Sequence, residues 1–491
     1  MTMTASGIVD ALGGVVGSDR VLTGEAERAY FSTDLSFVPG EIADVVVQPG
    51  SAEEVAAVVR IAAEAGLPVV PRGGGMSYTH TFLTGKPGAV LLDLRRLNRV
   101  VEINAEDMVM TVEAGATWEQ VYLAASEQGF RTPYWGPLSG RYATVGGTIS
   151  NNSVFFGSTR YGSTADAVRG LEVVLADGSI VRTGSWAHRN GTPFTRYYGP
   201  DLTGMFIADT GSMGIKTKAA LRLVNMPAAS VGLAFSVPSF DASNECILEV
   251  ARTELATEAY GFDPLYNDVF ADLGFAFLKG VEWSVFFAID GADDDIAEAA
   301  ANHVRSIASN YGTEIDPTVA MAVRADPFGA VRSVLMGPNG EVWMPLHGIF
   351  PRSKAKQAAD ACRAFLDQNA ATIEQHGIKI SLLTLASGTD FVFEPSFYWL
   401  DDLGQFRLER IEPEWAEKWK TIPANPETRE VGLRLRKELA AIFDELGCIH
   451  LQIGKYYDFA GNIEPTTRAA LQAVKGALDP NGVINPGSLG I

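Results

Sequence analysis

Apolar and polar positions in the first half of the chain predict strands and helices in alternation. Residues 43–48 (ADVVVQ) form a β-branched run typical of a strand, and the following PG interrupts it. Ser51 and Glu54 have the spacing of a capping box, and the apolar stripe of the helix that they open continues to Ala62. A second short strand at 67–71 then leads into three glycines. This order predicts a β-α-β unit that ends in a glycine loop.

Further short strands are expected in the same half of the chain. Each is a run rich in Val, Leu and Ile, and the ADG that closes one of them is typical of a hairpin turn. The four runs lie at residues 89–94, 109–113, 171–176 and 221–224.

The pattern changes near Pro227. Over residues 230–440 apolar positions recur at helical spacing in long stretches such as 294–311, with strands between them, as at 283–289. This is typical of a separate α+β domain. The other elements expected there and beyond are a helix at 354–375, a strand at 377–383, a proline-rich connection at 410–430 and a last helix at 466–477.

The charge balance limits the partners of the protein. Its 491 residues carry 39 Lys and Arg against 59 Asp and Glu, a formal charge of −20. Nucleic acid and anionic membranes repel such a protein, so neither is expected as a partner. The sequence shows no signal-peptide pattern, no apolar run long enough to span a membrane and no C-x-x-C pair. We therefore expect a cytoplasmic protein in a reducing compartment.

Four segments are rich in Gly, Ser, Thr and Asn. They lie at 72–79, 136–152, 157–163 and 211–217. Consecutive glycines let backbone N–H groups approach a phosphate, although a single such segment is more often only a turn. The phosphate-loop and G-x-G-x-x-G patterns are both missing from the sequence, which disfavours a Rossmann site for NAD. Four segments at strand ends favour a long ligand held by backbone groups.

The order of these segments resembles the flavoprotein family of vanillyl-alcohol oxidase and p-cresol methylhydroxylase (PCMH-type FAD-binding proteins), which includes glycolate-oxidase-D-like FAD-linked oxidases. The resemblance rests on PRGGG, TVGGTISNN, STRYGSTADAVRG, GSMGIKT and, near the end, NGVINPGSLGI. It implies an α+β, two-domain PCMH-type fold. Residues 1–228 would bind FAD, 229–440 would form an α+β substrate (cap) domain, and 441–491 would return to the FAD domain.

The same resemblance implies which residues contact FAD. They come from the four glycine-rich segments and from the C-terminal tail. The implied contacts are Arg72, Gly73, Gly74, Gly75, Met76, Ser77, Gly146, Gly147, Thr148, Ser150, Asn151, Gly157, Tyr161, Gly162, Gly211, Ile215 and Asn485.

FAD is expected to be bound noncovalently. Relatives that tether flavin often use a His in the glycine loop, where this chain has Met76, or a Cys near the second glycine segment, where residues 144–152 have none. Tyr398 is the alternative tether. The D-lactate branch of the family resembles a metal site of clustered histidines, whereas no two of the six His here have ligand spacing, so no metal is expected.

The segment 448–458 (CIHLQIGKYYD) concentrates candidate catalytic groups. Read as a strand, it would place His450 and Tyr456 on one face and Lys455 and Tyr457 on the other. We predict that Tyr456 hydrogen-bonds the substrate oxygen, with Lys455 and His450 nearby. The alternative is a structural strand with one polar face.

Three further residues are candidates for catalysis. Arg160 could bind a carboxylate or make a surface ion pair. His347, in the apolar run WMPLHG, is expected to line the cap or to be a hydrogen-bonded core residue. Glu394, inside FVFEPSFYW, must be paired, neutralised or line a cavity.

These observations predict an FAD-dependent oxidoreductase acting on a hydroxyl-bearing small molecule. An aromatic alcohol or phenol is the leading substrate, although Ser163 and Tyr457 stand where 4-hydroxybenzyl-type oxidases of the family carry an acid and an arginine. The alternatives are a D-2-hydroxy-acid dehydrogenase and a flavin-binding scaffold without turnover. A homodimer is one assembly open to the protein.

Overall fold

The first sheet contains the predicted β-α-β unit. In the computed structural model, which describes residues 5–37, 40–272 and 274–491, its strand order is β1-β2-β4-β3, and β4 runs parallel to both β2 and β3. Helix α3 (Ala52–Glu64) connects β2 to β3, and the Ser51 side chain accepts from the Glu54 N–H, as the capping-box spacing predicts. The strands are β1 Val21–Leu22, β2 Val45–Val47, β3 Val69–Arg72 and β4 Val90–Asp93.

A second, antiparallel sheet completes this part of the chain. Its order is β5-β6-β10-β8-β9, and α4 (Trp118–Ser126) and α5 (Val145–Asn151) contribute to the core beside it. The strand predicted at 221–224 is wrong in its bounds, because β10 ends at Arg222 and β11 (Val224–Asn225) pairs with β7 (Phe130–Arg131) instead. The strands are β5 Val100–Asn104, β6 Val109–Glu113, β8 Val168–Val174, β9 Ile180–Arg182 and β10 Ile215–Arg222.

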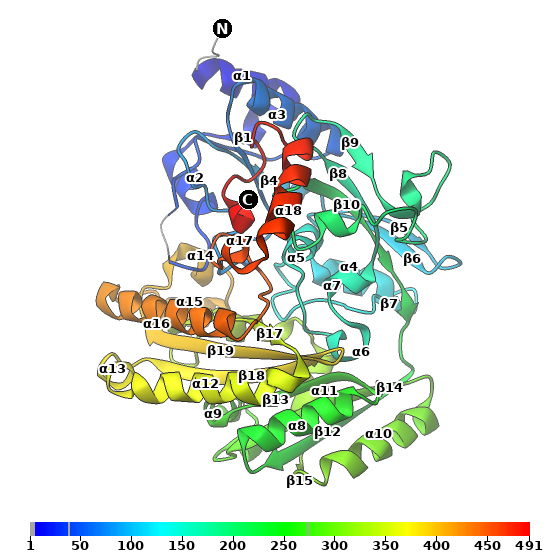
Figure 1. Ribbon diagram of the computed structural model, residues 1–491, viewed down its shortest axis with the longest axis vertical. Coiled ribbons are helices and arrows are strands. Elements are labelled where there is room, and N and C mark those ends of the chain that lie inside the picture. The colour runs from blue at the N-terminus through cyan, green and yellow to red at the C-terminus, as the bar shows by residue number, and fades with distance from the viewer. Residues whose placement is uncertain (1–4, 38–39, 273) are drawn as a thin grey trace.

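The middle of the chain forms one large antiparallel sheet (Figure 1). Its order is β15-β12-β14-β13-β18-β19-β16, with β17 also paired to β19. One face packs against α8 (Phe240–Ala251) and α10 (Asp294–Ala308). The opposite face carries aromatic residues and contacts Val154 and Phe155 of the first part. The strands are β12 Ala229–Val237, β13 Ala256–Phe262, β14 Trp283–Gly291, β15 Thr313–Ile315, β16 Glu341–Pro345, β17 Gly348–Phe350, β18 Lys379–Ser387 and β19 Asp390–Leu400.

The helices differ from the prediction in two places. The helix expected at 354–375 is interrupted at Asn369, and the proline-rich connection expected at 410–430 holds α15 and the start of α16 (Pro426–Glu445), both of which have Pro in their first turn. Proline suits that position because its N–H is not needed there. The remaining α-helices are α1 Ala5–Val16, α2 Glu25–Phe31, α6 Ser158–Tyr161, α7 Thr164–Ala167, α9 Pro264–Asp272, α11 Thr318–Ala325, α12 Ala355–Gln368, α13 Ala370–Gln375, α14 Gly404–Leu408, α15 Pro413–Trp419, α17 Phe459–Asn462 and α18 Pro465–Leu478.

The C-terminal tail lies against the first sheet, and α18 is seen beside the N-terminal elements (Figure 1). The Val69 N–H donates to Val483 O at 2.8 Å, and Val69 pairs with Ile484 in a parallel bridge. The boundary placed between residues 440 and 441 falls inside α16, because Leu439 and Phe443 of that helix belong to one core with β19.

Buried ion pairs join the two parts of the molecule. Arg131 Nη2 lies 2.6 Å from Asp290 Oδ2, and Arg324 contacts both Asp290 and Glu258. The Trp135 ring has the Arg131 and Arg324 guanidinium carbons at 4.1 Å and 4.8 Å from its centroid. Opposite charges buried together in this way fix how the large sheet sits on the first part. None of the helices in the described residues has both the length and the apolar character needed to cross a membrane.

Candidate functional site

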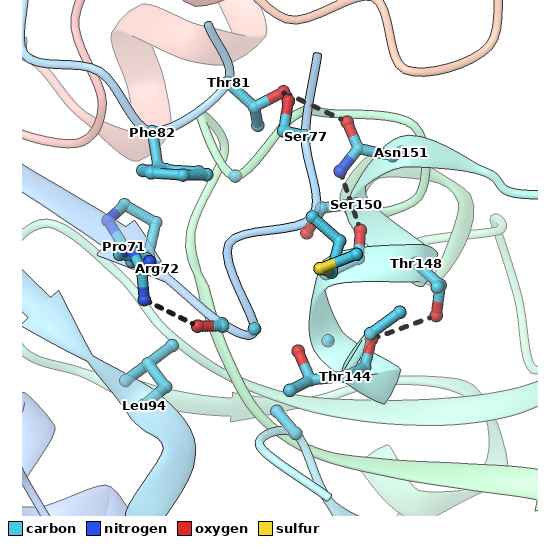
Figure 2. A pocket seen from close by; sticks show the side chains of 18 of the residues that line it. Pro71, Arg72, Ser77, Thr81, Phe82, Leu94, Thr144, Thr148, Ser150 and Asn151 are labelled. Atoms are coloured by element: carbon cyan, nitrogen blue, oxygen red, sulfur yellow. Dashed lines mark hydrogen bonds between the residues drawn. The ribbon is translucent and has the colours of Figure 1, made fainter. Parts of the chain in front are cut away.

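A cavity of about 880 Å³ runs along the glycine loop that follows β3 (Figure 2). Its walls come from that loop, from α5 and from the segment that leads into β10. Most residues that the sequence predicts as cofactor contacts line it. They are Arg72, Gly73, Gly74, Gly75, Met76, Ser77, Gly146, Gly147, Thr148, Ser150, Asn151, Gly211 and Ile215.

The first two glycines of the loop have no room for a side chain. A Cβ on Gly74 would lie 1.8 Å from Tyr142 O, and one on Gly73 would lie 2.2 Å from Thr144 Oγ1. The loop backbone therefore packs directly on the neighbouring segment, which leaves the other side of the loop open to the cavity. This is the construction expected where peptide groups approach a phosphate closely.

Arg72 supplies a buried positive charge to the cavity. Its side chain is 1% exposed, and burial lowers the pKa of its guanidinium to about 9. Nη1 donates to Gly73 O, whereas Nε and Nη2 have no hydrogen-bond partner (Figure 2). The rings of Phe31, Phe82 and Phe406 surround the guanidinium at 5.0–5.4 Å. Because a buried cation needs a counter-charge, this side of the cavity suits an anion such as a pyrophosphate.

Hydrogen bonds inside the protein hold the opposite wall in place. Asn151 Nδ2 donates to Gly147 O, and Thr81 Oγ1 donates to Asn151 Oδ1 (Figure 2). Near the start of β10, the Lys216 ammonium lies 2.5 Å from the buried Asp209 carboxylate, which also accepts from the Gly211 N–H. The cavity therefore has a fixed shape. It combines a cationic end with a backbone-lined wall, and these features fit a dinucleotide such as FAD.

Four of the residues predicted to contact the cofactor lie outside this lining. Gly157 donates its N–H to Glu258 in the large sheet, and Tyr161 ends α6, which packs against β13 and β18; Gly162 follows that helix. Asn485 supports the wall from behind, because its Nδ2 donates to Thr81 O and Thr210 O. Arg160 is exposed and lies over the Tyr161 ring at 5.5 Å. The structure therefore does not bring Arg160 to the cavity.

The strand predicted over 448–458 is wrong. This segment has one isolated bridge, from Ile449 to Ile349, and then turns at Gln452 and Gly454, both of which have positive φ. The turn brings Gly454 against the backbone of Thr79, where a Cβ would lie 2.0 Å from Thr79 O. Period-two alternation does not apply to such a turn, so the assignment of its side chains to two faces fails.

Lys455 and Tyr456 follow this turn, and the buried Tyr456 hydroxyl has no hydrogen-bond partner among the described residues. Lys455 Nζ donates to Leu83 O and to Asn485 Oδ1, and burial lowers the pKa of its amine to about 8. The Tyr456 ring lies 4.0 Å from the Arg436 guanidinium carbon and edge-on to His80. Burial lowers the pKa of His80 to about 4, helped by nearby cations. Neither Lys455 nor Tyr456 belongs to the cavity lining.

His347 and Glu394 meet in a buried pair. His347 Nε2 lies 3.0 Å from Glu394 Oε2, both residues are buried, and His347 Nδ1 has no hydrogen-bond partner. The other candidate histidine, His450, has both ring nitrogens engaged, with His347 O at 2.6 Å and Asp444 Oδ1 at 2.8 Å. The three candidates therefore form one network, in which His347 carries the free nitrogen.

A second, narrow hollow lies against the large sheet, and we call it the aromatic chamber; neither His347 nor Glu394 lines it. Its walls include Leu138, which lies between two residues that line the first cavity, Pro137 and Ser139. Leu383 also lines it and pairs with Glu394 across β18 and β19, so their side chains share a face. The aromatic walls are Phe155, Tyr260, Phe262, Tyr266 and Phe270.

Sequence reasoning did not identify several residues that line the first cavity. Thr81, Thr210 and Lys216 adjoin or lie within the glycine-rich segments, so their position next to those segments was a usable signal. Gln452 had no such signal, since it reaches the cavity only through the turn described above. The others are Pro71, Phe82, Leu94, Ala114, Pro137, Ser139, Ala143, Thr144, Ser153 and Gly214. Among the described residues no group of three His, Cys, Asp or Glu side chains is placed to hold a metal ion.

Two models of known protein domains match this chain. Residues 43–184 match the model of an FAD binding domain, and residues 459–489 match that of the C-terminal domain of FAD linked oxidases. The chain is 26% identical to a probable mitochondrial D-lactate dehydrogenase of Danio rerio over 99% of this chain and 92% of that protein. These matches confirm FAD as the cofactor.

Two further relatives match over a shorter span. The chain is 30% identical to the glycolate oxidase subunit GlcD of Bacillus subtilis and 33% identical to a D-2-hydroxyglutarate dehydrogenase of Xanthomonas citri. In both cases the match spans about half of this chain and 50% of the relative.

Solved structures with the same fold cover nearly the whole chain. The 4-ethylphenol oxidase from Gulosibacter chungangensis has a TM-score of 0.77 at 18% identity, covering 99% of this chain and 97% of its own. The p-cresol methylhydroxylase has a TM-score of 0.76 at 19% identity, covering 99% and 96%. The α+β, PCMH-type fold expected from the sequence is confirmed.

Proposed function

We propose that this chain, which has the PCMH-type fold and matches FAD-linked oxidases at both ends, oxidises a hydroxyl-bearing organic molecule with FAD as the electron acceptor. An aromatic alcohol or phenol is the substrate class that we favour. The observation that carries this choice is the aromatic face of the large sheet, where Phe155, Tyr260 and Phe262 pack together, since such a surface suits a planar apolar molecule better than a small, fully hydrated acid.

His347 and Glu394 are the groups that we assign to proton transfer. FAD, when bound, would accept the two electrons that leave the substrate carbon. His347 Nδ1, which has no partner, would accept the proton of the substrate hydroxyl. Glu394 would accept a hydrogen bond from Nε2–H and stabilise the charged imidazole as it forms.

A D-2-hydroxy acid is the second candidate substrate. It is favoured by relatives named as glycolate oxidase, D-lactate dehydrogenase and D-2-hydroxyglutarate dehydrogenase. A carboxylate would need a cation, and Arg436 is the group that we would assign to it, because the guanidinium is 1% exposed and its Nη1 has no partner.

An anaerobic substrate screen tests this proposal. The purified holoenzyme is mixed with benzyl-type alcohols, alkylphenols, D-lactate and glycolate, and the visible absorbance of FAD is followed. We expect an aromatic member of the panel to bleach the flavin fastest. Bleaching by the 2-hydroxy acids alone would select the second candidate. A flavin that stays oxidised with every compound would contradict the proposal and leave a flavin-binding scaffold.

A further inference from the structure

A hollow of about 390 Å³ lies against the second sheet, apart from the FAD cavity. Its walls come from β8, from the ends of β6 and β10 and from the segment that follows β9. They include two arginines, Arg169 and Arg222, and the aromatic ring of Phe194. Strand β10 begins at Ile215, which lines the FAD cavity, and ends at Arg222, so about 24 Å of strand separates the two sites.

A β-bulge brings Arg169 to this hollow. Gly170 and Val168 pair with two consecutive residues of β10, so Arg169 between them has no partner in that strand. An extra residue of this kind bends the strand and re-aims its own side chain. The Arg169 side chain therefore joins that of Arg222, the last residue of β10, in the wall of one hollow.

The two arginines of the hollow carry uncompensated charge. In the part of the chain that the structure describes, neither Arg169 nor Arg222 makes an ion pair or a side-chain hydrogen bond, whereas the neighbouring Arg196 is paired with Asp201. Burial and the positive charge of Arg222 both lower the pKa of the Arg169 guanidinium. Two guanidinium groups that repel each other are stabilised by an anion that contacts both.

The rest of the wall suits an organic group. The Phe194 residue is 57% exposed, and a flat ring can stack on it. Met108 and Val224 add apolar surface. The Asp107 carboxylate also lines the hollow, and it accepts a hydrogen bond from the Asn104 amide at 3.0 Å. Among the described contacts it forms no ion pair with either arginine, so it does not neutralise them.

We infer that this hollow binds a small aromatic phosphate monoester, with the phosphate on Arg169 and Arg222 and the ring against Phe194. A phosphate suits two guanidinium groups better than a carboxylate does, because it carries up to twice the charge and has three acceptor oxygens. The size agrees, since an apolar cavity of ~150 Å³ already admits benzene. The inference stands apart from the proposed oxidation, because the hollow shares no lining residue with the FAD cavity.

Calorimetry with three anions tests the inference. Phenyl phosphate, inorganic phosphate and benzoate are each titrated into the holoenzyme in a buffer free of phosphate. We expect phenyl phosphate to bind about tenfold more tightly than either of the others, because inorganic phosphate has no ring and benzoate has a single charge. Phenyl phosphate that gives no saturable heat, or that binds no more tightly than benzoate or inorganic phosphate, would overturn the inference.

Variants of the lining residues locate the binding. Arg169→Gln and Arg222→Gln are each expected to weaken phenyl phosphate about tenfold or more, the effect of losing a hydrogen bond to a charged group, with FAD content unchanged. Phe194→Ala should bring the affinity for phenyl phosphate close to that for inorganic phosphate. Arg189→Gln is the matched control and should change neither affinity, since Arg189 is an exposed arginine of the same segment that does not line the hollow. Unchanged binding of phenyl phosphate to a protein with both arginine substitutions would place the ligand at another site and contradict the inference.

Discussion

Nε2 of His347 lies 3.0 Å from Oε2 of Glu394, and both side chains are buried against the face of the large sheet that lines the aromatic chamber. A histidine oriented by a carboxylate, with its other nitrogen free, has the arrangement of a general base.

The first prediction concerns this pair. His347→Gln should slow anaerobic flavin reduction by about 10²–10⁴-fold, the usual contribution of a general base, while FAD content stays unchanged. Glu394→Gln should slow flavin reduction less than His347→Gln does, because it removes the orienting charge and leaves the base. Stopped-flow absorbance measures both rates. His450→Gln is the control, since both nitrogens of His450 already bind protein groups, and it should cost less than tenfold. Equal rates of flavin reduction for His347→Gln and wild type would mean that His347 is not the general base.

The second prediction separates the two adjacent tyrosines. The Tyr457 hydroxyl accepts a hydrogen bond from the backbone N–H of His347 at 3.2 Å, so Tyr457→Phe leaves that buried N–H without a partner. Such a loss costs about 1–3 kcal/mol in the free energy of unfolding, measured by urea denaturation of the holoenzyme. Tyr456→Phe should slow flavin reduction less than fivefold, because Tyr456 lies outside the cavity lining. A larger loss of rate for Tyr456→Phe would restore it as a substrate contact.

The third prediction concerns the glycine loop. Gly74→Ala should abolish FAD binding, because its Cβ would lie 1.8 Å from Tyr142 O and the loop must move. Gly85→Ala is the matched control, as a Cβ there meets no atom within 4 Å. Flavin absorbance per mole of purified protein is the measurement. Full FAD content in the Gly74→Ala protein would mean that the loop shape does not matter for binding.

The fourth prediction is that FAD is released intact by acid. Met76 lines the cavity at the place where tethered relatives often carry His, and its thioether offers no ring nitrogen for a flavin bond. After precipitation with trichloroacetic acid, the yellow colour should be in the supernatant. Colour that stays with the pellet would point to a tether, with Tyr398 the first residue to examine by peptide mass spectrometry.

The fifth prediction is a pH dependence of stability from Lys455. Burial lowers the pKa of its amine to about 8 in the folded protein, against about 10.4 when unfolded. Between these values the unfolded state binds more protons, so the free energy of unfolding rises with pH by about 1.4 kcal/mol per unit. From pH 8 to 9.5 the wild type should therefore gain up to about 2 kcal/mol relative to Lys455→Met in urea denaturation. If the unfolding free energies of the two proteins change with pH in parallel, burial does not lower the pKa of the Lys455 amine.

Local patterns determined most of the first sheet and the cofactor loop. The capping box at Ser51, the β-branched runs and the glycine segments act over a few residues, and the structure confirms the β-α-β unit that they predict. The same locality explains why so many of the cofactor contacts predicted from the sequence line the cavity, since the glycines are adjacent in sequence to the strands that position them.

Contacts between distant segments determined the rest. The turn at Gln452 and Gly454 exists because that backbone packs against Thr79, and no alternation of polar residues reports such a contact. The same reason applies to Arg160 and Gly157, whose glycine-rich segment resembles a cofactor loop but packs on the large sheet.

By itself, the sequence determined an α+β flavoprotein with FAD as its cofactor, because those features depend on residues that lie close together in the chain. Only the tertiary structure placed His347 beside Glu394, freed one nitrogen of that histidine and brought Arg169 and Arg222 to one hollow. These relationships depend on sheet register and on the packing of the large sheet against the first part, which bring together residues that the sequence keeps far apart.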